Sequence, residues 1–161
     1  GEGRQAAAHN VGCRWWHRVS HPRREVACKC RERFRGYIAE RYVKDEHFVG
    51  ASGITKDGTI ISALNLAGSP RGIDECAEPG VLSQIIAGEH GDLATIVAVR
   101  HESETESYVV APCGKCREFI LRYAPDALII VPDSSESLRK VPIDMLLPFR
   151  YKHHAQNTEP K

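Results

Sequence analysis

Residues 93–100, Leu93-Ala94-Thr95-Ile96-Val97-Ala98-Val99-Arg100, are the stretch from which the fold can be read. The run is short, apolar and rich in β-branched side chains, which is typical of a strand buried on both sides in an α/β sheet. Helical patterns lie on either side of it, at 76–87 and at 113–123, and a second buried strand is expected at 127–131. This alternation of strand and helix predicts an α/β fold in which helices flank a mixed sheet.

Upstream of this strand, residues 48–55 and 59–66 have strand character, and Lys56-Asp57-Gly58 between them carries the Asp-Gly signal of a tight turn. We therefore expect an antiparallel hairpin. Apolar side chains recur at steps of three and four over residues 22–42, which indicates an amphipathic helix that covers one face of the sheet. A short strand is expected at 108–110.

The chain has 161 residues and a formal net charge of +1, and 42% of its residues are hydrophobic. This is an ordinary globular composition for a single domain. The charge is unevenly distributed, because residues 1–36 contain nine Lys or Arg and three Asp or Glu. We divide the chain into a basic extension without regular structure (1–21), one domain (22–150) and a polar tail (151–161).

The basic start of the chain has three interpretations: a nucleic-acid arm, a segment that binds a protein partner, or a solvated extension with no function of its own. Trp15 and Trp16 lie among arginines, as aromatic side chains do in proteins that bind single strands. Two aromatic residues do not make a stacking platform, so we do not expect nucleic acid to be a partner.

No apolar run approaches the roughly 18 residues that a membrane span needs, and no secretory signal pattern is present. We therefore expect a soluble, cytoplasmic protein. The six cysteines could form disulfides, but the chain is larger than a disulfide-stapled mini-domain and two of them form a Cys-x-x-Cys pair. Metal binding is the better interpretation.

Two motifs carry the chemistry, Cys76-Ala77-Glu78 and Pro112-Cys113-Gly114-Lys115-Cys116-Arg117. Each motif begins a predicted helix, where the helix dipole and free backbone N–H groups favour the thiolate that binds zinc. Three thiolates leave one tetrahedral position of zinc open for water, as in catalytic zinc sites. A nearby carboxylate can then move protons, and Glu78 is the candidate. The motifs predict one catalytic Zn²⁺ per chain, held by Cys76, Cys113 and Cys116.

Other interpretations of the cysteines stay open. Alone, the pair Cys113 and Cys116 could be a redox pair or half of a structural zinc site. Cys13, Cys28 and Cys30, with histidines near them, could supply a fourth ligand or a separate metal site.

Three thiolates give Zn²⁺ a formal charge of −1, which weakens it as a Lewis acid. Arg117 directly follows Cys116 and is predicted to donate N–H groups to the thiolates.

Together the two motifs resemble the diagnostic pair of the zinc-dependent cytidine deaminase family, and a looser resemblance runs from about Tyr42 to Phe149. It implies a three-layer α/β/α sandwich around a mixed five-stranded sheet, assembled as a homotetramer. It also implies a hydrolytic deaminase in which water attacks C4 of a cytosine-type ring. Glu78 would then protonate N3 and afterwards the departing amine.

Cysteine in place of histidine as the first ligand is similar to the branch that acts on free nucleosides, so a small-molecule nucleoside is expected as substrate. The resemblance implies that Asn65 binds the sugar hydroxyls, that Phe48 stacks on the base and that Ala77 contacts the substrate. The residues alone leave purely structural roles open, in which Phe48 is a strand residue that faces the core and Asn65 caps the end of a strand.

The chain departs from the nucleoside enzymes at two places. Where they read Asn-x-Glu, it has Asn65-Leu66-Ala67, so a carboxylate expected to hold the ribose is missing. Pro79-Gly80 also follows Glu78, where helix formers are usual. The blasticidin S deaminase branch, which accepts a bulkier cytosine nucleoside analogue, is the alternative. An alternative of another class is a zinc-stabilised binding module without turnover.

Overall fold

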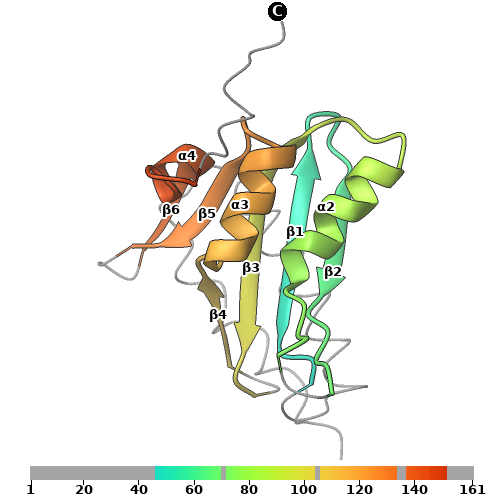
Figure 1. Ribbon diagram of the computed structural model, residues 1–161, viewed down its shortest axis with the longest axis vertical. Coiled ribbons are helices and arrows are strands. Elements are labelled where there is room, and N and C mark those ends of the chain that lie inside the picture. The colour runs from blue at the N-terminus through green and yellow to red at the C-terminus, as the bar shows by residue number, and fades with distance from the viewer. Residues whose placement is uncertain (1–45, 70–71, 104–105, 134–136, 152–161) are drawn as a thin grey trace, which may run out of the picture.

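The computed structural model describes residues 46–69, 72–103, 106–133 and 137–151 (Figure 1). The helix predicted at 22–42, the extension 1–21 and nearly all of the tail 151–161 lie outside the described residues. The predictions that concern Cys13, Cys28 and Cys30 fall in the same part of the chain.

The described residues form one mixed sheet with helices packed on it. The strands are β1 (Val49–Thr55), β2 (Ile60–Leu64), β3 (Leu93–His101), β4 (Ser107–Val110), β5 (Leu128–Pro132) and β6 (Leu138–Pro142). The helices are α2 (Ala77–Ala87), α3 (Gly114–Tyr123) and α4 (Ile143–Leu146).

β3 is the centre of the sheet, as its sequence predicts. The strand order is β2-β1-β3-β5-β6, and β4 also pairs with β3. One edge of β3 pairs with β1, and the other is shared, since its first half pairs with β5 and its second half with β4. The β3–β5 pairing is parallel and the others are antiparallel. The sheet is therefore mixed, as expected.

The sheet has six strands where the resemblance implied five. β6 and α4 lie in a stretch for which the sequence predicts no element. β6 reads Leu-Arg-Lys-Val-Pro and lies at an edge of the sheet, so it needs neither a long apolar run nor a central-strand composition. Its pattern is accordingly too weak to predict a strand.

Two apolar clusters occupy the two faces of the sheet. Ile96 and Ala98 of β3 belong to the larger cluster, together with side chains of α2 and α3 such as Val81 and Ile120. Val97 and Val99, which point the other way, form the smaller cluster with Ile130. Helices α2 and α3 thus cover the same face of the sheet, as Figure 1 shows.

The predicted hairpin turn is present between β1 and β2. Gly58 has a φ of 90°, in the left-handed region that glycine adopts without strain. The Asp57 carboxylate accepts hydrogen bonds from the Thr59 N–H at 3.0 Å and from the Gly91 N–H at 3.2 Å. The turn is therefore tied to the loop that precedes β3.

Gly80, unexpected in a helix from its propensity, has a packing reason. A Cβ atom built on Gly80 would lie 2.8 Å from the Cβ of Ala63 in β2. Glycine lets the first turn of α2 pack close against the sheet, so the Pro79-Gly80 departure does not prevent the helix from starting at Ala77. Among the described residues, no helix combines the length and apolarity needed to cross a membrane.

Candidate metal centre and active site

The structure brings together the three cysteines that the sequence singles out. Sγ of Cys76 lies 3.5 Å from Sγ of Cys113, which lies 3.5 Å from Sγ of Cys116. All three sulfurs lie within 4.8 Å of one another, and within the described ranges no other group of His, Cys, Asp or Glu residues is arranged to hold a metal. We refer to these three residues as the thiol cluster.

The thiol cluster lies where two helices begin. Cys76 is the N-cap residue of α2 and Cys113 is the N-cap residue of α3, and neither helix has a side-chain cap. The two helices lie side by side on the sheet with these ends together (Figure 1). Free N–H groups and the positive ends of two helix dipoles therefore surround the sulfurs and favour negative charge there.

The donor set fits zinc. Two sulfurs bound tetrahedrally at about 2.3 Å from Zn²⁺ would lie roughly 3.8 Å apart, close to the separations in the thiol cluster. The described part of the chain offers this group no fourth donor, and three thiolates leave one position of a tetrahedral ion free. This donor chemistry suits a catalytic ion better than a closed structural one.

The environment treats the three thiols differently. Burial is the largest effect on the pKa of Cys76 and of Cys116 and raises both. Burial also raises the pKa of the exposed Cys113, but hydrogen bonds with the Cys116 backbone N–H and with the Cys116 and Cys76 thiols outweigh it, so that this pKa is lowered. Cys113 is therefore the sulfur that is deprotonated most easily.

Glu78 lies inside the protein beside the thiol cluster. It is 5% exposed, and burial raises the pKa of its carboxyl group, with the Cys116 thiol and Lys115 acting in the opposite direction. A raised pKa favours the protonated form of a carboxyl group, which can then donate a proton as well as accept one. Ala77, between Cys76 and Glu78, is fully buried in the larger core cluster, so its methyl group packs inside the protein.

The side chain of Asn65 is engaged with the backbone. Its Oδ1 accepts hydrogen bonds from the N–H groups of Phe48 and Val49, both at 2.9 Å, and its Nδ2 donates to the carbonyl of Glu46 at 2.9 Å. One Nδ2 hydrogen has no acceptor within the described ranges. These contacts match the interpretation of Asn65 as a residue that caps a strand end.

Phe48 directly precedes β1, and its ring contacts Arg100 rather than only the core. The Arg100 Cζ atom lies 5.2 Å from the ring centroid, a cation–π distance. The ring is partly buried, so Phe48 is neither a fully buried strand residue nor a free aromatic face.

Arg117 is anchored by two backbone carbonyls. Its Nε donates to the carbonyl of Pro112 at 2.8 Å, and an Nη donates to the carbonyl of Leu146 at 3.1 Å. Between described residues, its guanidinium makes no hydrogen bond to a sulfur. These two carbonyls take two of the five guanidinium N–H groups, and donation by Arg117 to the thiolates stays a prediction.

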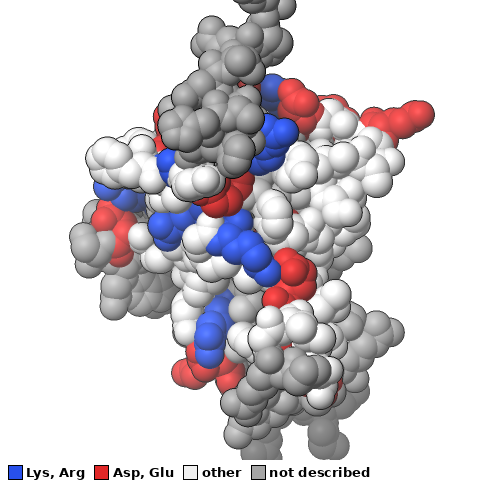
Figure 2. Space-filling model, in the orientation of Figure 1, with Lys and Arg blue, Asp and Glu red and all other residues white. Residues whose placement is uncertain are grey.

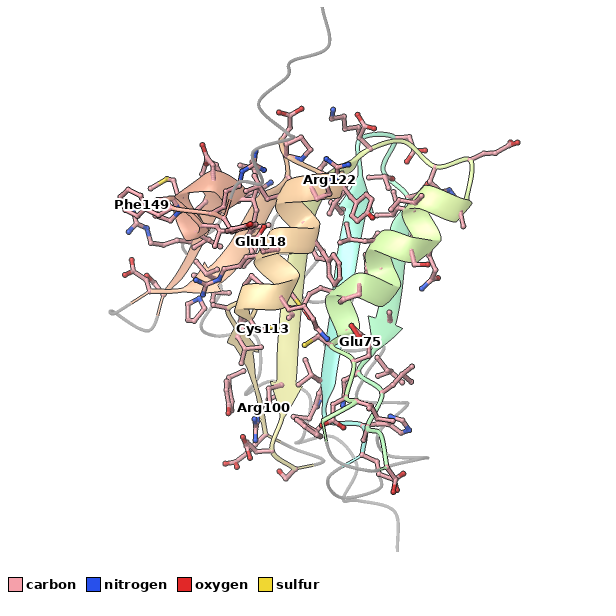
Figure 3. All side chains as sticks on the ribbon, in the orientation of Figure 1. Glu75, Arg100, Cys113, Glu118, Arg122 and Phe149 are labelled. Atoms are coloured by element: carbon pink, nitrogen blue, oxygen red, sulfur yellow. The ribbon has the colours of Figure 1, made fainter. Side chains whose placement is uncertain are left out.

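Two groups of charged residues near the cluster were not found from the sequence. Lys115 forms an ion pair with Glu75, with Nζ 2.9 Å from Oε1, and this links the starts of α2 and α3. Lys115 lies within a motif, but nothing in the sequence identifies its partner 40 residues away. Figure 3 labels Glu75 near Cys113 and places Arg100 on the adjacent end of β3.

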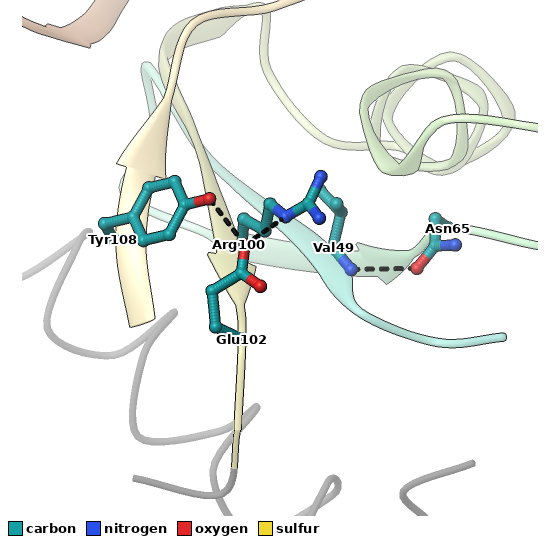
Figure 4. A network of polar contacts seen from close by, with 5 residues as sticks. All are labelled: Val49, Asn65, Arg100, Glu102 and Tyr108. Atoms are coloured by element: carbon teal, nitrogen blue, oxygen red, sulfur yellow. Dashed lines mark hydrogen bonds and ion pairs between the residues drawn. The ribbon is translucent and has the colours of Figure 1, made fainter. Parts of the chain in front are cut away.

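The second group is a network at the end of β3, drawn in Figure 4. Arg100 Nε lies 2.7 Å from Oε1 of Glu102, and the Tyr108 hydroxyl donates to the same oxygen at 2.6 Å. On the face shown in Figure 2, basic and acidic side chains are interspersed, without a continuous basic stripe among the coloured residues.

Sequence comparison finds relatives that match most of the chain. No protein-family model matches it. It is 38% identical to the blasticidin-S deaminase of Bacillus cereus over 118 residues, which are 71% of this chain and 84% of that protein. It is 28% identical to the cytidine deaminase of Halalkalibacterium halodurans over 109 residues, 66% of this chain and 80% of the relative.

The fold agrees with a solved structure. The crystal structure of the cytidine deaminase from Bacillus anthracis superposes with a TM-score of 0.67 at 17% identity, covering 81% of this chain and 90% of that one. At this identity the likeness concerns the fold, and it matches the mixed sheet with flanking helices described above.

Proposed function

The chain belongs to the cytidine deaminase family, and from this we propose that it hydrolyses the exocyclic amine of a cytosine-type nucleoside at the thiol cluster. Water and the nucleoside would give the uracil-type product and ammonia. The observation that carries the proposal is the placement of a buried glutamate, Glu78, beside three cysteine sulfurs that lie within 4.8 Å of one another.

Cys76, Cys113 and Cys116 would hold one Zn²⁺ ion per chain. Zinc, when bound, supplies a Lewis acid that makes water a nucleophile near neutral pH. The helix N-termini at Cys76 and Cys113 and the nearby Lys115 ammonium would balance the negative charge of the three thiolates.

Glu78 would carry the protons. Its carboxylate would take a proton from the attacking water and give it to N3 of the ring as the new C4–O bond forms. It would then take the proton of the C4 hydroxyl and give it to the amine as the C4–N bond breaks and C4=O forms. Burial of Glu78 supports this role, since a raised pKa lets the group hold the proton between the two steps.

The test is turnover by purified protein that carries zinc. Cytidine, deoxycytidine, cytosine and blasticidin S are incubated with it while the ultraviolet change on deamination is followed. Glu78→Gln should lower kcat by about 10²–10⁴-fold with zinc content unchanged. Glu118→Gln, which alters an exposed glutamate of α3, is the matched control and should keep wild-type rates.

Equal turnover by the Glu78→Gln variant would overturn the proposed role of this residue. Absence of turnover with all four compounds would favour the alternative of a zinc-stabilised binding module.

Blasticidin S is the second candidate substrate, and a specific observation favours it. The 38% identity to a blasticidin-S deaminase over 84% of that relative exceeds the 28% identity to a cytidine deaminase over 80%. Ala67 also stands where the nucleoside enzymes are expected to have a ribose-binding carboxylate. A kcat/KM for blasticidin S well above that for cytidine would assign the chain to this branch.

Three further statements stay predictions. A homotetramer in solution would be seen as four times the chain mass of 17.9 kDa. The second is that Phe48 contacts the base and Asn65 the sugar. The third is a cytoplasmic location.

A further inference from the structure

Arg100 lies on the sheet face that carries the thiol cluster. It pairs with Val49 of β1 on one side and with Tyr108 of β4 on the other. Residues paired across antiparallel strands point to the same side of the sheet. Since Val49 packs against the core cluster shared with α2 and α3, Arg100 and Tyr108 emerge on that same face.

Arg100 is also at the end of the sheet where the thiol cluster lies. It is the next-to-last residue of β3, which ends at the same edge of the sheet as β2. Cys76 belongs to this edge, because it directly follows Glu75, the residue that bridges to Leu66 just past the end of β2. Figure 3 shows Arg100 beyond Cys113 and Glu75 at this end, outside the starts of α2 and α3. A ligand with its base at the cluster and its remainder directed outward along the sheet would point toward Arg100.

Two contacts hold the Arg100 side chain in place, and a third fixes one of its partners. Its Nε is bound by Glu102, which is fixed in turn by the Tyr108 hydroxyl, and the guanidinium lies over the Phe48 ring. The terminal Nη1 and Nη2 groups have no acceptor among the described residues, and the side chain is 43% exposed. A guanidinium held through Nε and one face presents two parallel donors to solvent, the geometry that binds a carboxylate or phosphate bidentately.

We propose that Arg100 is a specificity-determining residue that binds an acidic group, a carboxylate or a phosphate, on the sugar side of the substrate. This inference rests on the proposed function, and it names the substrate class as cytosine nucleosides with an anionic substituent.

The charges at this end of the sheet support an anionic substituent. β2 and β3 run in the same direction, because each is antiparallel to β1, so both end at this edge. Ala67 follows the end of β2, where the nucleoside enzymes are expected to carry a carboxylate. That carboxylate would repel an acid, and its absence removes the repulsion. Glu102 still opposes an anion, but its bonded oxygen is shared by two donors, Arg100 and Tyr108.

The test compares substrates that differ by one acidic group. Cytidine, cytidine 5′-carboxylate and cytidine 5′-monophosphate are assayed with zinc-loaded wild type, Arg100→Gln and Arg100→Lys. For Arg100→Gln, the ratio of kcat/KM for the better acidic substrate to that for cytidine should fall by about tenfold to a hundredfold, as for a lost charged hydrogen bond. For Arg100→Lys, which keeps the positive charge and loses the bidentate guanidinium, this ratio should lie between those of wild type and Arg100→Gln.

Lys56→Gln is the matched control. It removes a cation that is also in an exposed ion pair, with Asp92, but lies in the hairpin turn at the opposite end of the sheet. Its ratio should stay within about twofold of wild type, since exposed charges beyond a Debye length of roughly 8 Å are largely screened. Comparison of cytidine 5′-carboxylate with cytidine 5′-monophosphate shows which acidic group the site accepts.

A second readout does not depend on turnover. Calorimetric binding of uridine and of uridine 5′-carboxylate is measured with wild type and Arg100→Gln, and only the acidic ligand should lose affinity. The proposal is overturned if the ratios are unchanged in Arg100→Gln, if Lys56→Gln changes them equally, or if wild type prefers neither acid to the neutral compound. Absence of turnover with every cytosine compound would instead contradict the proposed function.

Discussion

Lys115 and Glu75 connect the starts of the two helices that carry the thiol cluster, with Nζ of Lys115 2.9 Å from Oε1 of Glu75. The ammonium also interacts electrostatically with Cys76 and Cys116. An exposed pair of this kind contributes at most about 1 kcal/mol to stability. Its effect should therefore appear at the metal rather than in the fold.

Lys115→Met should weaken zinc binding several-fold, since it removes a cation beside three thiolates, and should change the free energy of unfolding by less than about 1 kcal/mol. Competition with a chelator measures the zinc affinity. Lys56→Met, which breaks the Lys56–Asp92 pair at the other end of the sheet, is the control. Equal zinc affinities of the two variants would contradict the prediction.

Serine at Cys76, Cys113 or Cys116 should abolish zinc retention, because two thiolates do not complete the site. Elemental analysis of purified protein should give one zinc per wild-type chain and less than about a tenth of that in each variant. The double variant Cys28→Ser/Cys30→Ser should keep its zinc. Two zinc ions per chain, or loss of zinc from the double variant, would show that the other cysteines bind metal.

Asn65→Ala should lower the free energy of unfolding by about 3 kcal/mol, because three hydrogen bonds to backbone groups of residues 46, 48 and 49 are lost, each contributing about 1 kcal/mol. Urea denaturation measures the change. Ser62→Ala, in the same hairpin, removes one hydroxyl contact with Ser52 and should cost about 1 kcal/mol. Similar values for both variants would show that the Asn65 amide does not brace the start of β1.

Arg117→Ala should destabilise the protein by about 2 kcal/mol, since it frees the carbonyls of Pro112 and Leu146 from charged donors. The loop that ends at Cys113 and the end of α4 would then lose their common anchor. Arg122→Ala, an exposed change in the last turn of the same helix, should leave the urea midpoint nearly unchanged. An unaltered midpoint in Arg117→Ala, accompanied by lost activity, would contradict the anchoring role and support the predicted role of Arg117 at the sulfurs.

Asp57 should make stability depend on pH. Hydrogen bonds from the Thr55 hydroxyl and from the N–H groups of Thr59 and Gly91 hold the pKa of the Asp57 carboxyl well below its usual range. A pKa lower in the folded than in the unfolded state stabilises the fold above the unfolded value of about 3.9, and this contribution is lost as pH falls through the folded value. Wild type should exceed Asp57→Asn in stability at pH 7.

The difference in stability between wild type and Asp57→Asn should narrow as the pH is lowered below about 4. Urea denaturation at pH 7, 5 and 3 checks it. A constant difference at all three values would mean that the ionised form of Asp57 has no special stabilisation.

The sequence predicts the elements that depend on local patterns. The β-branched run 93–100, the Asp57-Gly58 turn and the cysteines at two helix starts appear in the structure within one or two residues of their predicted places. Each is determined by side chains that are neighbours along the chain, so its signal lies within a short window.

Contacts between distant segments could not be predicted in this way. Arg117 was assigned to the sulfurs because it follows Cys116, yet its partner Leu146 lies 29 residues away. The pairing of Lys115 with Glu75 and the contact of Phe48 with Arg100 likewise join separate elements. β6 needed its neighbour β5 to become a strand at all.

The position of the thiol cluster has a mechanical consequence. Cys76 and Cys113 are 37 residues apart in the chain, and the intervening segment contains α2, the central strand and β4. An ion bound by both cysteines would cross-link the two ends of this loop. A cross-link of such a span lowers the entropy of the unfolded chain, which is equivalent to about 4 kcal/mol of stability. The zinc ion proposed for catalysis would then also hold the starts of α2 and α3 together. Removal of the metal should therefore lower the stability of the fold as well as abolish activity.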